Sequence, residues 1–178
     1  MIGGCARSAS RFDPCFPWPA SSQHVRDDGG TITAYDGDRI MAIFVGDMQA
    51  TDAVRSAFKI NWAIENIVNP VFFAAYREYH RQLRHTVGID SGRLLASKIG
   101  IRSNADMVWV GPAANYAAKL NSFEGLDSDY QIRITTRTHA KLNGEFQWIS
   151  SGKAVWDGPY NNLGEISHYR SSCVFQID

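Results

Sequence analysis

Residues 31–45 read TITAYDGDRIMAIFV and hold two β-favouring runs on either side of an Asp-Gly pair. The runs cover 31–35 and 40–45. An Asp-Gly pair between two such runs favours a tight turn that joins antiparallel strands. The stretch therefore predicts a β-hairpin whose turn carries two carboxylates, Asp36 and Asp38.

Short strands and helices alternate after this hairpin. Apolar residues three or four apart predict a helix over 50–68, which the Asn69-Pro70 pair should end or kink. Further helices are expected over 72–83, 112–120 and 136–142. Strands are expected over 84–89, 93–99, 107–110 (short and buried), 131–135 and 146–149, with one or two more in 166–177. This alternation indicates an α+β domain with a mixed or antiparallel sheet covered by helices.

The composition is that of one globular domain. The chain has 178 residues, 44% of them hydrophobic, and 18 Lys plus Arg balance 18 Asp plus Glu. We therefore expect one core and no non-specific binding of nucleic acid. No run approaches the roughly 18 apolar residues of a membrane span, and no signal-peptide pattern opens the chain, which predicts a soluble cytoplasmic protein. We expect an irregular arm over 1–29 and the domain over 30–178.

Two pairs of polar residues are candidates for chemistry. Asp36 and Asp38 could hold a hard cation through oxygen ligands, although solvated carboxylates on an ordinary turn have the same pattern. Asn115 and Lys119 lie four apart in a predicted helix and so share one face. Small alanines around them leave that face open to a phosphate, although a lysine in water on a surface helix has the same spacing.

A third group lies in a predicted loop ahead of residue 107. It consists of Arg102, Asn104 and Asp106. Loops on a rigid scaffold often carry ligand contacts, and a charged surface loop is the alternative interpretation.

Three segments, taken in order, resemble one known family. They read GGTITAYDGDRIMAIF (29–44), RHTVGIDSGRLLASKIG (84–100) and DMVWVGPAANYAAKLNSF (106–123). They resemble the catalytic domain of class III nucleotidyl cyclases, which shows Gly-Asp before Met-Ala and Phe, a Gly-Ile-x-x-Gly hairpin, and a Gly ahead of Asn-x-Ala-Ala/Ser-Arg. The chain is most similar to the pyrimidine cyclases of bacterial Pycsar anti-phage systems, which share the run YDGDR and a lysine in the last motif. The resemblance implies a ferredoxin-like βαββαβ fold.

The resemblance also implies partners and residue roles. It implies a homodimer with composite active sites at the interface, two divalent ions (Mn²⁺ or Mg²⁺), and conversion of UTP or CTP to the 3′,5′-cyclic monophosphate and pyrophosphate. Asp38 matches the second metal-binding aspartate of the family. Asn115 matches the asparagine that orients the ribose, and Lys119 matches the arginine that neutralises the phosphates. Arg102 is expected as a further substrate contact.

Tyr35 bears on the choice of base. Adenylate-type cyclases have an adenine-reading pair at the positions of Ala34 and Val108, and that pair is absent here. Tyr35 matches a tyrosine that pyrimidine cyclases place where a larger purine would otherwise sit, so the resemblance implies UTP or CTP rather than ATP. The alternative is a strand residue that packs on the core.

The first metal aspartate of the family is not assigned. The resemblance places it upstream of the 37 residues that precede Asp38, and Asp13 has neither the strand pattern nor the spacing. We expect either a truncated or altered N-terminus or a domain with one metal ligand fewer. The leading hypothesis is a pyrimidine cyclase that makes cyclic UMP or cyclic CMP for a separate effector protein in anti-phage defence. The alternative is a catalytically degenerate cyclase-like domain that binds nucleotide or pairs with an intact partner.

Overall fold

The computed structural model describes residues 2–5, 18–36, 39–76, 82–101, 104–122, 129–148 and 151–176. Its helices are α1 (Trp18–Asp27), α2 (Gln49–Ala63), the π-helical η1 (Ile64–Val68), α3 (Asn69–Ala75), α4 (Pro112–Asn121), α5 (Thr136–His139) and the 3₁₀ turn η2 (Gly144–Phe146). Its strands are β1 (Ile2–Cys5), β2 (Thr31–Asp36), β3 (Arg39–Ile43), β4 (Thr86–Ile89), β5 (Leu95–Ile101), β6 (Asn104–Val110), β7 (Ile132–Thr135), β8 (Asp157–Leu163) and β9 (Ile166–Ser171).

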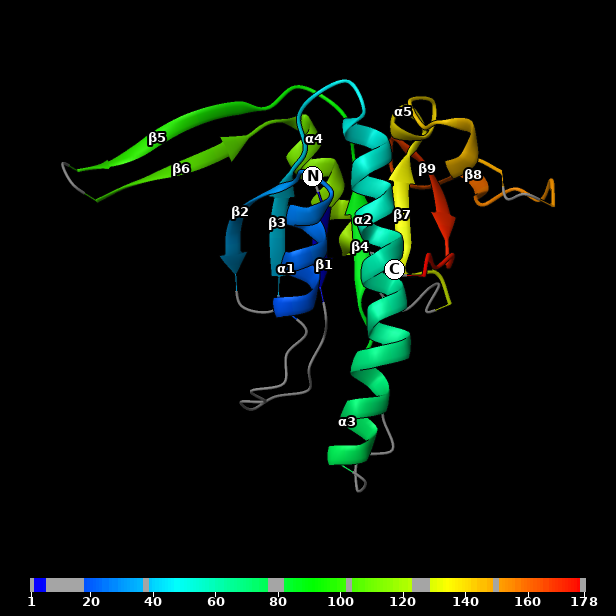
Figure 1. Cartoon of the computed structure of the whole chain (residues 1–178). Helices are drawn as coiled ribbons and strands as arrows, with labels where there is room; N and C mark the ends of the chain where they lie inside the picture. Colours follow the sequence, from blue (N-terminus) through cyan, green and yellow to red (C-terminus); the bar gives the residue numbers. More distant parts are fainter. Residues whose placement is uncertain are drawn as a thin grey trace.

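Seven of these strands form one sheet, in the order β2-β3-β1-β4-β7-β9-β8 (Figure 1). The first four strands pair antiparallel, and β4 pairs parallel with β7. Together with α1 and α2, the strands β1 to β4 make a βαββαβ unit with β1 and β3 at its centre. The expected α+β class and the ferredoxin-like arrangement are confirmed.

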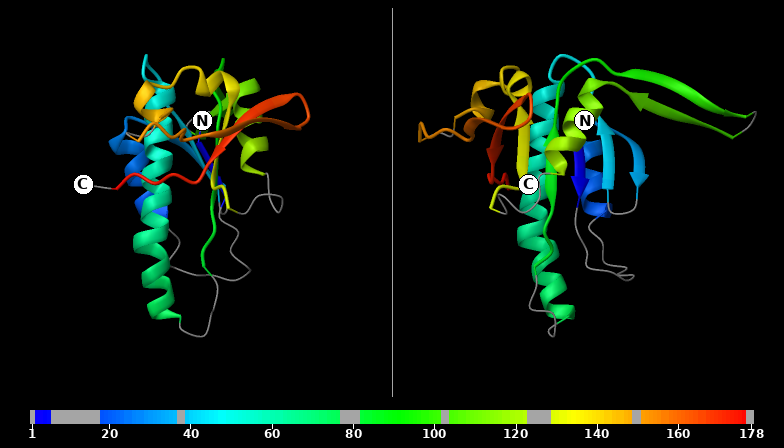
Figure 2. Two further views of the ribbon diagram at one scale, coloured as in Figure 1. Left: turned by 90° about the vertical axis from the view of Figure 1, so that its right-hand side faces the viewer. Right: turned by 180° about the vertical axis from the view of Figure 1, so that it is seen from behind.

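Helices cover both faces of this sheet. In Figure 2, α1 and α2 lie on one face and α4 lies on the other. The core between α2 and the sheet is built from completely or almost completely buried residues, including Val54, Ala57, Phe58, Val87, Ile89, Ile132 and Ile134. The apolar residues spaced three or four apart in α2 therefore form one face of the helix, and this face packs against the sheet as predicted.

The β2–β3 hairpin is confirmed. Asp36 pairs with Arg39 at its closed end, so the connection consists of residues 37–38, which lie outside the described residues. The predicted helix over 112–120 and the strands over 84–89 and 131–135 are also confirmed, within a few residues, as α4, β4 and β7.

The expectation of an irregular arm over 1–29 is wrong for two of its parts. Residues 2–5 form β1, which pairs with β3 on one side and β4 on the other. Residues 18–27 form α1, whose Val25 is buried in the core and whose following residue Asp28 accepts a hydrogen bond from Lys59 of α2 at 2.7 Å. Neither part has a persistent helical or strand periodicity in its own sequence. Both are stabilised by tertiary packing against residues far along the chain, which local periodicity does not reveal.

Asn69-Pro70 does not end the long helix. The backbone N–H of Asn69 donates to the carbonyl of Ile64 across the π-helical turn, and Pro70 then falls in the first turn of α3, where a missing N–H is tolerated. The helix therefore continues to Ala75, and residues 77–81 of the second predicted helix lie outside the described ones. Within the described part of the chain, no helix combines the length and apolar character needed to span a membrane.

The strand predicted over 107–110 is neither short nor buried. It belongs to β6, which pairs with β5 from Leu95↔Val110 to Ile101↔Asn104 in a separate two-stranded ribbon. This ribbon projects away from the main sheet (Figure 1). Asn104 and Asp106 therefore belong to a strand and not to the predicted loop. The apolar run of β6 looks like a core strand in sequence, but more than half of Met107 and of Val110 is exposed.

Two other elements differ from expectation. The strand predicted over 146–149 is replaced by η2 and an isolated bridge between Trp148 and Ala154. The strand β8, whose sequence DGPYNNL contains turn-forming residues, was not predicted. It forms because β9 pairs with it antiparallel through an irregular register.

Candidate functional site

Helix α4 presents Asn115 and Lys119 to solvent from one face. It begins after Gly111 with Pro112 in its first turn, where the missing N–H is harmless. Its opposite face is buried through Ala113, Ala117 and Leu120. The predicted sharing of one exposed face is confirmed, because this burial determines the rotation of the helix about its axis.

The C-terminal end of α4 is tied to β4. The hydroxyl of Thr86 donates to the backbone carbonyl of Asn121 at 2.8 Å and lies 2.9 Å from its side-chain oxygen. Near the other end of the helix, Ala113 lies against Gly92, which follows β4. The helix thus runs antiparallel to β4 and is held at both ends.

Tyr35 lies on the edge strand β2, with 55% of its surface exposed. Its phenolic oxygen shares a hydrogen bond of 3.0 Å with the hydroxyl of Ser22 on α1, and Ser22 is buried. The exposure argues against the alternative that Tyr35 is a core residue. The bond to α1 anchors the phenol while leaving ring surface available to a ligand.

Two of the predicted site residues, Asp38 and Arg102, lie outside the described residues. Within the described ranges, no three His, Cys, Asp or Glu side chains gather closely enough to hold a metal ion.

Of the two predicted site residues on α4, Lys119 lies two residues before Asn121 at the end of the helix that is tied to β4, whereas Asn115 lies farther from that end. Arg39, which flanks residues 37–38, pairs with Cys5, and Cys5 pairs with Thr86 at the start of β4. Thr86 holds the C-terminal end of α4, whereas Asn115 lies six residues earlier, roughly 9 Å along the helix axis. The sheet also stands between the α1 face and the α4 face (Figure 2).

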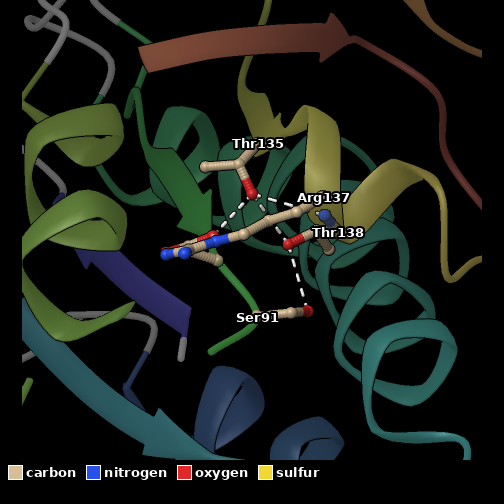
Figure 3. Close-up of polar contacts among 5 residues, drawn as sticks. Ser91, Thr135, Arg137 and Thr138 are labelled. Carbon is tan, nitrogen blue, oxygen red and sulfur yellow. Dashed lines mark hydrogen bonds and ion pairs between the residues drawn. The ribbon is translucent and has the colours of Figure 1, made fainter. Parts of the chain in front are cut away.

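A buried polar network lies beside the start of α4, and sequence reasoning missed it (Figure 3). The guanidinium of Arg137 forms a two-pronged ion pair with Asp90, whose side chain is fully buried; Nε donates to Oδ1 at 2.6 Å. The hydroxyl of Thr135 also donates to Asp90 Oδ1, at 2.5 Å. Thr138 joins Thr135 to Ser91 through its own hydroxyl, at 3.0 and 3.1 Å. The hydrogen bond to Asp90 raises the pKa of Arg137 above its ordinary value.

No pattern of neighbouring residues in the sequence predicts this network. Asp90 and Arg137 are 47 residues apart, and Asp90 fits a simple turn after β4. A cavity of about 30 Å³ adjoins it, lined in part by Asp90, Ser91 and Ala113. This space holds about one water molecule, and its lining includes none of Tyr35, Asn115 and Lys119.

The chain matches known proteins over most of its length. Residues 33–169 match the family described as the adenylate and guanylate cyclase catalytic domain. A uridylate cyclase of Xanthomonas perforans is 43% identical over 85% of this chain and 64% of its own length. A uridylate cyclase of Burkholderia cepacia is 43% identical over 76% of this chain and 57% of its own length. This chain thus spans less than two thirds of either relative.

Solved structures support the same fold. The crystal structure of the guanylyl cyclase Cya2 has a TM-score of 0.75 at 17% identity, covering 98% of this chain and 91% of that one. The family match contains most of the first of the three segments that carried the resemblance, 29–44, and all of the other two, 84–100 and 106–123. This chain therefore belongs to the family of class III adenylate and guanylate cyclase catalytic domains.

Proposed function

We propose that the chain is the catalytic domain of a pyrimidine nucleotidyl cyclase, which converts UTP or CTP to the 3′,5′-cyclic monophosphate and pyrophosphate. The observation that carries the proposal is the exposed pair Asn115 and Lys119 on α4, in a chain 43% identical to two uridylate cyclases over most of its length. The catalytic domain is taken as residues 30–178, with β1 from the preceding segment completing its sheet.

The reaction is an intramolecular displacement. The 3′-hydroxyl of the ribose gives up its proton to solvent, its oxygen forms a bond to the α-phosphorus, the bond from that phosphorus to the bridging oxygen breaks, and pyrophosphate leaves. Catalysis then depends on holding the ribose in line and on offsetting the charge that grows on the phosphoryl oxygens. The Asn115 amide can donate to and accept from the ribose, and the Lys119 ammonium supplies the positive charge. Arg102 is assigned to a further contact with the substrate.

Tyr35 is assigned to the choice of base. Its exposed ring extends from an edge strand, and its hydroxyl is engaged by Ser22. A phenol held in this way occupies space that the second ring of a purine would need, and it offers an aromatic face to a smaller pyrimidine. UTP and CTP are therefore the proposed substrates.

A homodimer with active sites at its interface is part of the proposal. The end of the sheet that flanks residues 37–38 and the Asn115 face of α4 are separated within one chain, so a second copy is needed to bring both to one triphosphate. The projecting ribbon supports this, because Leu95, Ile99 and Val110 expose more than half of their apolar surface along it. Exposed apolar surface of this kind is typical of protein contacts.

Divalent ions, Mn²⁺ or Mg²⁺, are proposed as cofactors because nucleotide triphosphates are bound together with such ions. Asp38 is assigned as one ligand, since it matches the metal-binding aspartate of the family. We also propose that the product acts in the cytoplasm, where nucleoside triphosphates are available, as a second messenger for a separate effector protein in anti-phage defence.

The test is the product formed from each of four nucleotides. Purified protein is incubated separately with ATP, GTP, CTP and UTP plus Mn²⁺, and products are identified by chromatography and mass spectrometry. We expect cyclic UMP or cyclic CMP. Lys119→Ala should lower the rate by about 10² to 10³, whereas Lys119→Arg, which keeps the charge, should retain most of it.

Two results would contradict the proposal. Cyclic AMP as the sole product would overturn the role given to Tyr35. Tight binding of a pyrimidine triphosphate by calorimetry, without turnover of any of the four nucleotides, would select the degenerate nucleotide-binding domain instead.

A further inference from the structure

The ring of Tyr116 on α4 lies beneath two cations. The Lys119 ammonium is 6.0 Å from the ring centroid, and the Arg137 guanidinium carbon is 5.1 Å from it. A cation within about 6 Å of an aromatic face is attracted by the ring quadrupole. Tyr116 therefore connects a proposed catalytic residue to the buried network around Asp90.

Arg137 is held in place on several sides. Its guanidinium pairs with both carboxylate oxygens of Asp90. The same carboxylate also accepts from Thr135. A Cβ at Gly92 would lie 3.3 Å from Arg137 Nη2 and 3.4 Å from Ala113 Cβ, which shows how closely the β4 turn, the guanidinium and the first turn of α4 approach. The planar fork of arginine makes such a two-pronged pair geometrically specific.

Burial of Asp90 explains why this arrangement is stable. An isolated carboxylate in the interior is costly, so Asp90 strongly favours a nearby Arg137. Arg137 itself is only partly covered, with 42% of its side chain exposed. Its guanidinium carbon lies over the ring of Tyr116, 5.1 Å from the centroid. The ring is thus positioned by a side chain that is itself anchored in the interior.

The nearby ring of Tyr116 restricts the conformations that the Lys119 side chain can adopt. A lysine carries a compact charge on a flexible four-carbon stem, and this stem loses rotamer entropy when it is ordered. Electrostatic stabilisation of a transition state is most effective when the charge is oriented before the reaction begins. An aromatic ring whose centroid lies 6.0 Å from the ammonium restricts that stem without removing its charge.

We propose that Tyr116 is a positioning residue for Lys119: its ring, braced by the Arg137–Asp90 pair, holds the ammonium over the face of α4 that meets the triphosphate. This inference rests on the proposed function for its effect on turnover. Its geometric part, the contact between ring and ammonium, stands without that function.

The kinetic test compares Tyr116→Leu with Tyr116→Phe. Because Phe keeps the aromatic face, Tyr116→Phe should stay within about twofold of the wild-type kcat. Tyr116→Leu should lower kcat about two- to fivefold with little change in KM, as expected for loss of an exposed cation–π contact. In a Lys119→Ala background, Tyr116→Leu should have no further effect, since coupled residues are non-additive. Arg137 is left intact, because its loss would strand the buried charge of Asp90.

An independent readout does not need turnover. Reductive ¹³C-methylation of lysines keeps their charge, and the Lys119 signal is assigned by its loss in Lys119→Arg. We expect this signal to be displaced by the ring current in the wild type and in Tyr116→Phe, and to return to the position of exposed Lys98 and Lys141 in Tyr116→Leu.

The outcomes separate the two proposals. If no nucleotide is turned over but the ring-current displacement behaves as expected, the proposed function fails and the contact stands. An unchanged Lys119 signal in Tyr116→Leu would overturn the positioning role. So would a Tyr116→Phe variant as slow as Tyr116→Leu, because that result would assign the effect to the hydroxyl.

Discussion

His85 is a titratable side chain whose burial affects stability. It lies just before β4, is 8% exposed, and its Nε2 has no hydrogen-bond partner among the described residues. Burial lowers the pKa of its imidazole from 6.5 to about 4. The unfolded chain therefore binds a proton at a higher pH than the folded chain does.

Acidification should destabilise the folded protein through His85. The native state keeps its full stability above the unfolded pKa and loses stability as the pH falls from about 6.5 toward the folded pKa of about 4. The pKa difference corresponds to about 3 kcal/mol over this window. We expect urea unfolding to show this loss in the wild type and a flatter profile in His85→Gln, which cannot take up the proton. Equal slopes for the two proteins would rule out His85 as the source.

At the scale of elements, Gly88 controls how closely α4 approaches β4. A Cβ at this position would lie 2.2 Å from the carbonyl oxygen of Ala117 and 2.7 Å from the backbone nitrogen of Asn121. Both atoms belong to the backbone of α4, so no side chain can move aside to make room. The helix that presents Asn115 and Lys119 can lie in this position because residue 88 is glycine.

Gly88→Ala should therefore push α4 away from the sheet. We expect a loss of about 2 to 3 kcal/mol in the free energy of unfolding, the magnitude of an overpacked core, and a fall in cyclase activity, because Asn115 and Lys119 move with the helix. Thermal and urea unfolding measure the first effect. Gly144→Ala is the matched control, since a Cβ there meets nothing within 4 Å; if both variants behaved alike, close packing at Gly88 would not be the cause.

At the scale of the whole molecule, the proposed site is shared between two copies of the chain. If Asp38 acts from one copy and the α4 face from the other, two inactive proteins can complement each other. An equimolar mixture of Asp38→Ala and Lys119→Ala contains heterodimers in which one of the two sites is intact. Random pairing in a two-fold dimer then restores about a quarter of wild-type activity.

The control is a mixture of Asn115→Ala with Lys119→Ala. Both changes lie on α4, so every site in every dimer keeps one defect and activity should stay at the level of the single variants. The measurement is the rate of cyclic nucleotide formation after the two variants have been mixed and their subunits have exchanged between dimers. Recovery in the control mixture, or none in the first, would contradict sites shared in this way.

Local sequence was sufficient for features that depend on neighbouring residues. The Asp-Gly pair predicted the β2–β3 hairpin, and the spacing of Asn115 and Lys119 predicted their common face on α4, because turn chemistry and helical periodicity act within a few residues. The motifs at 29–44, 84–100 and 106–123 led to the family for the same reason.

Contacts between distant parts of the chain could not be predicted from local sequence. The strand β1 contains two glycines and depends on partners 34 to 87 residues away, such as Arg39 opposite Cys5 and Ile89 opposite Ile2. The pair Asp90 and Arg137, the position of Tyr116 beneath two cations, and the projection of the β5–β6 ribbon depend likewise on how separate elements pack. Burial and ion pairing are set by three-dimensional neighbours, so these features emerge only when the sheet and both helical layers are assembled.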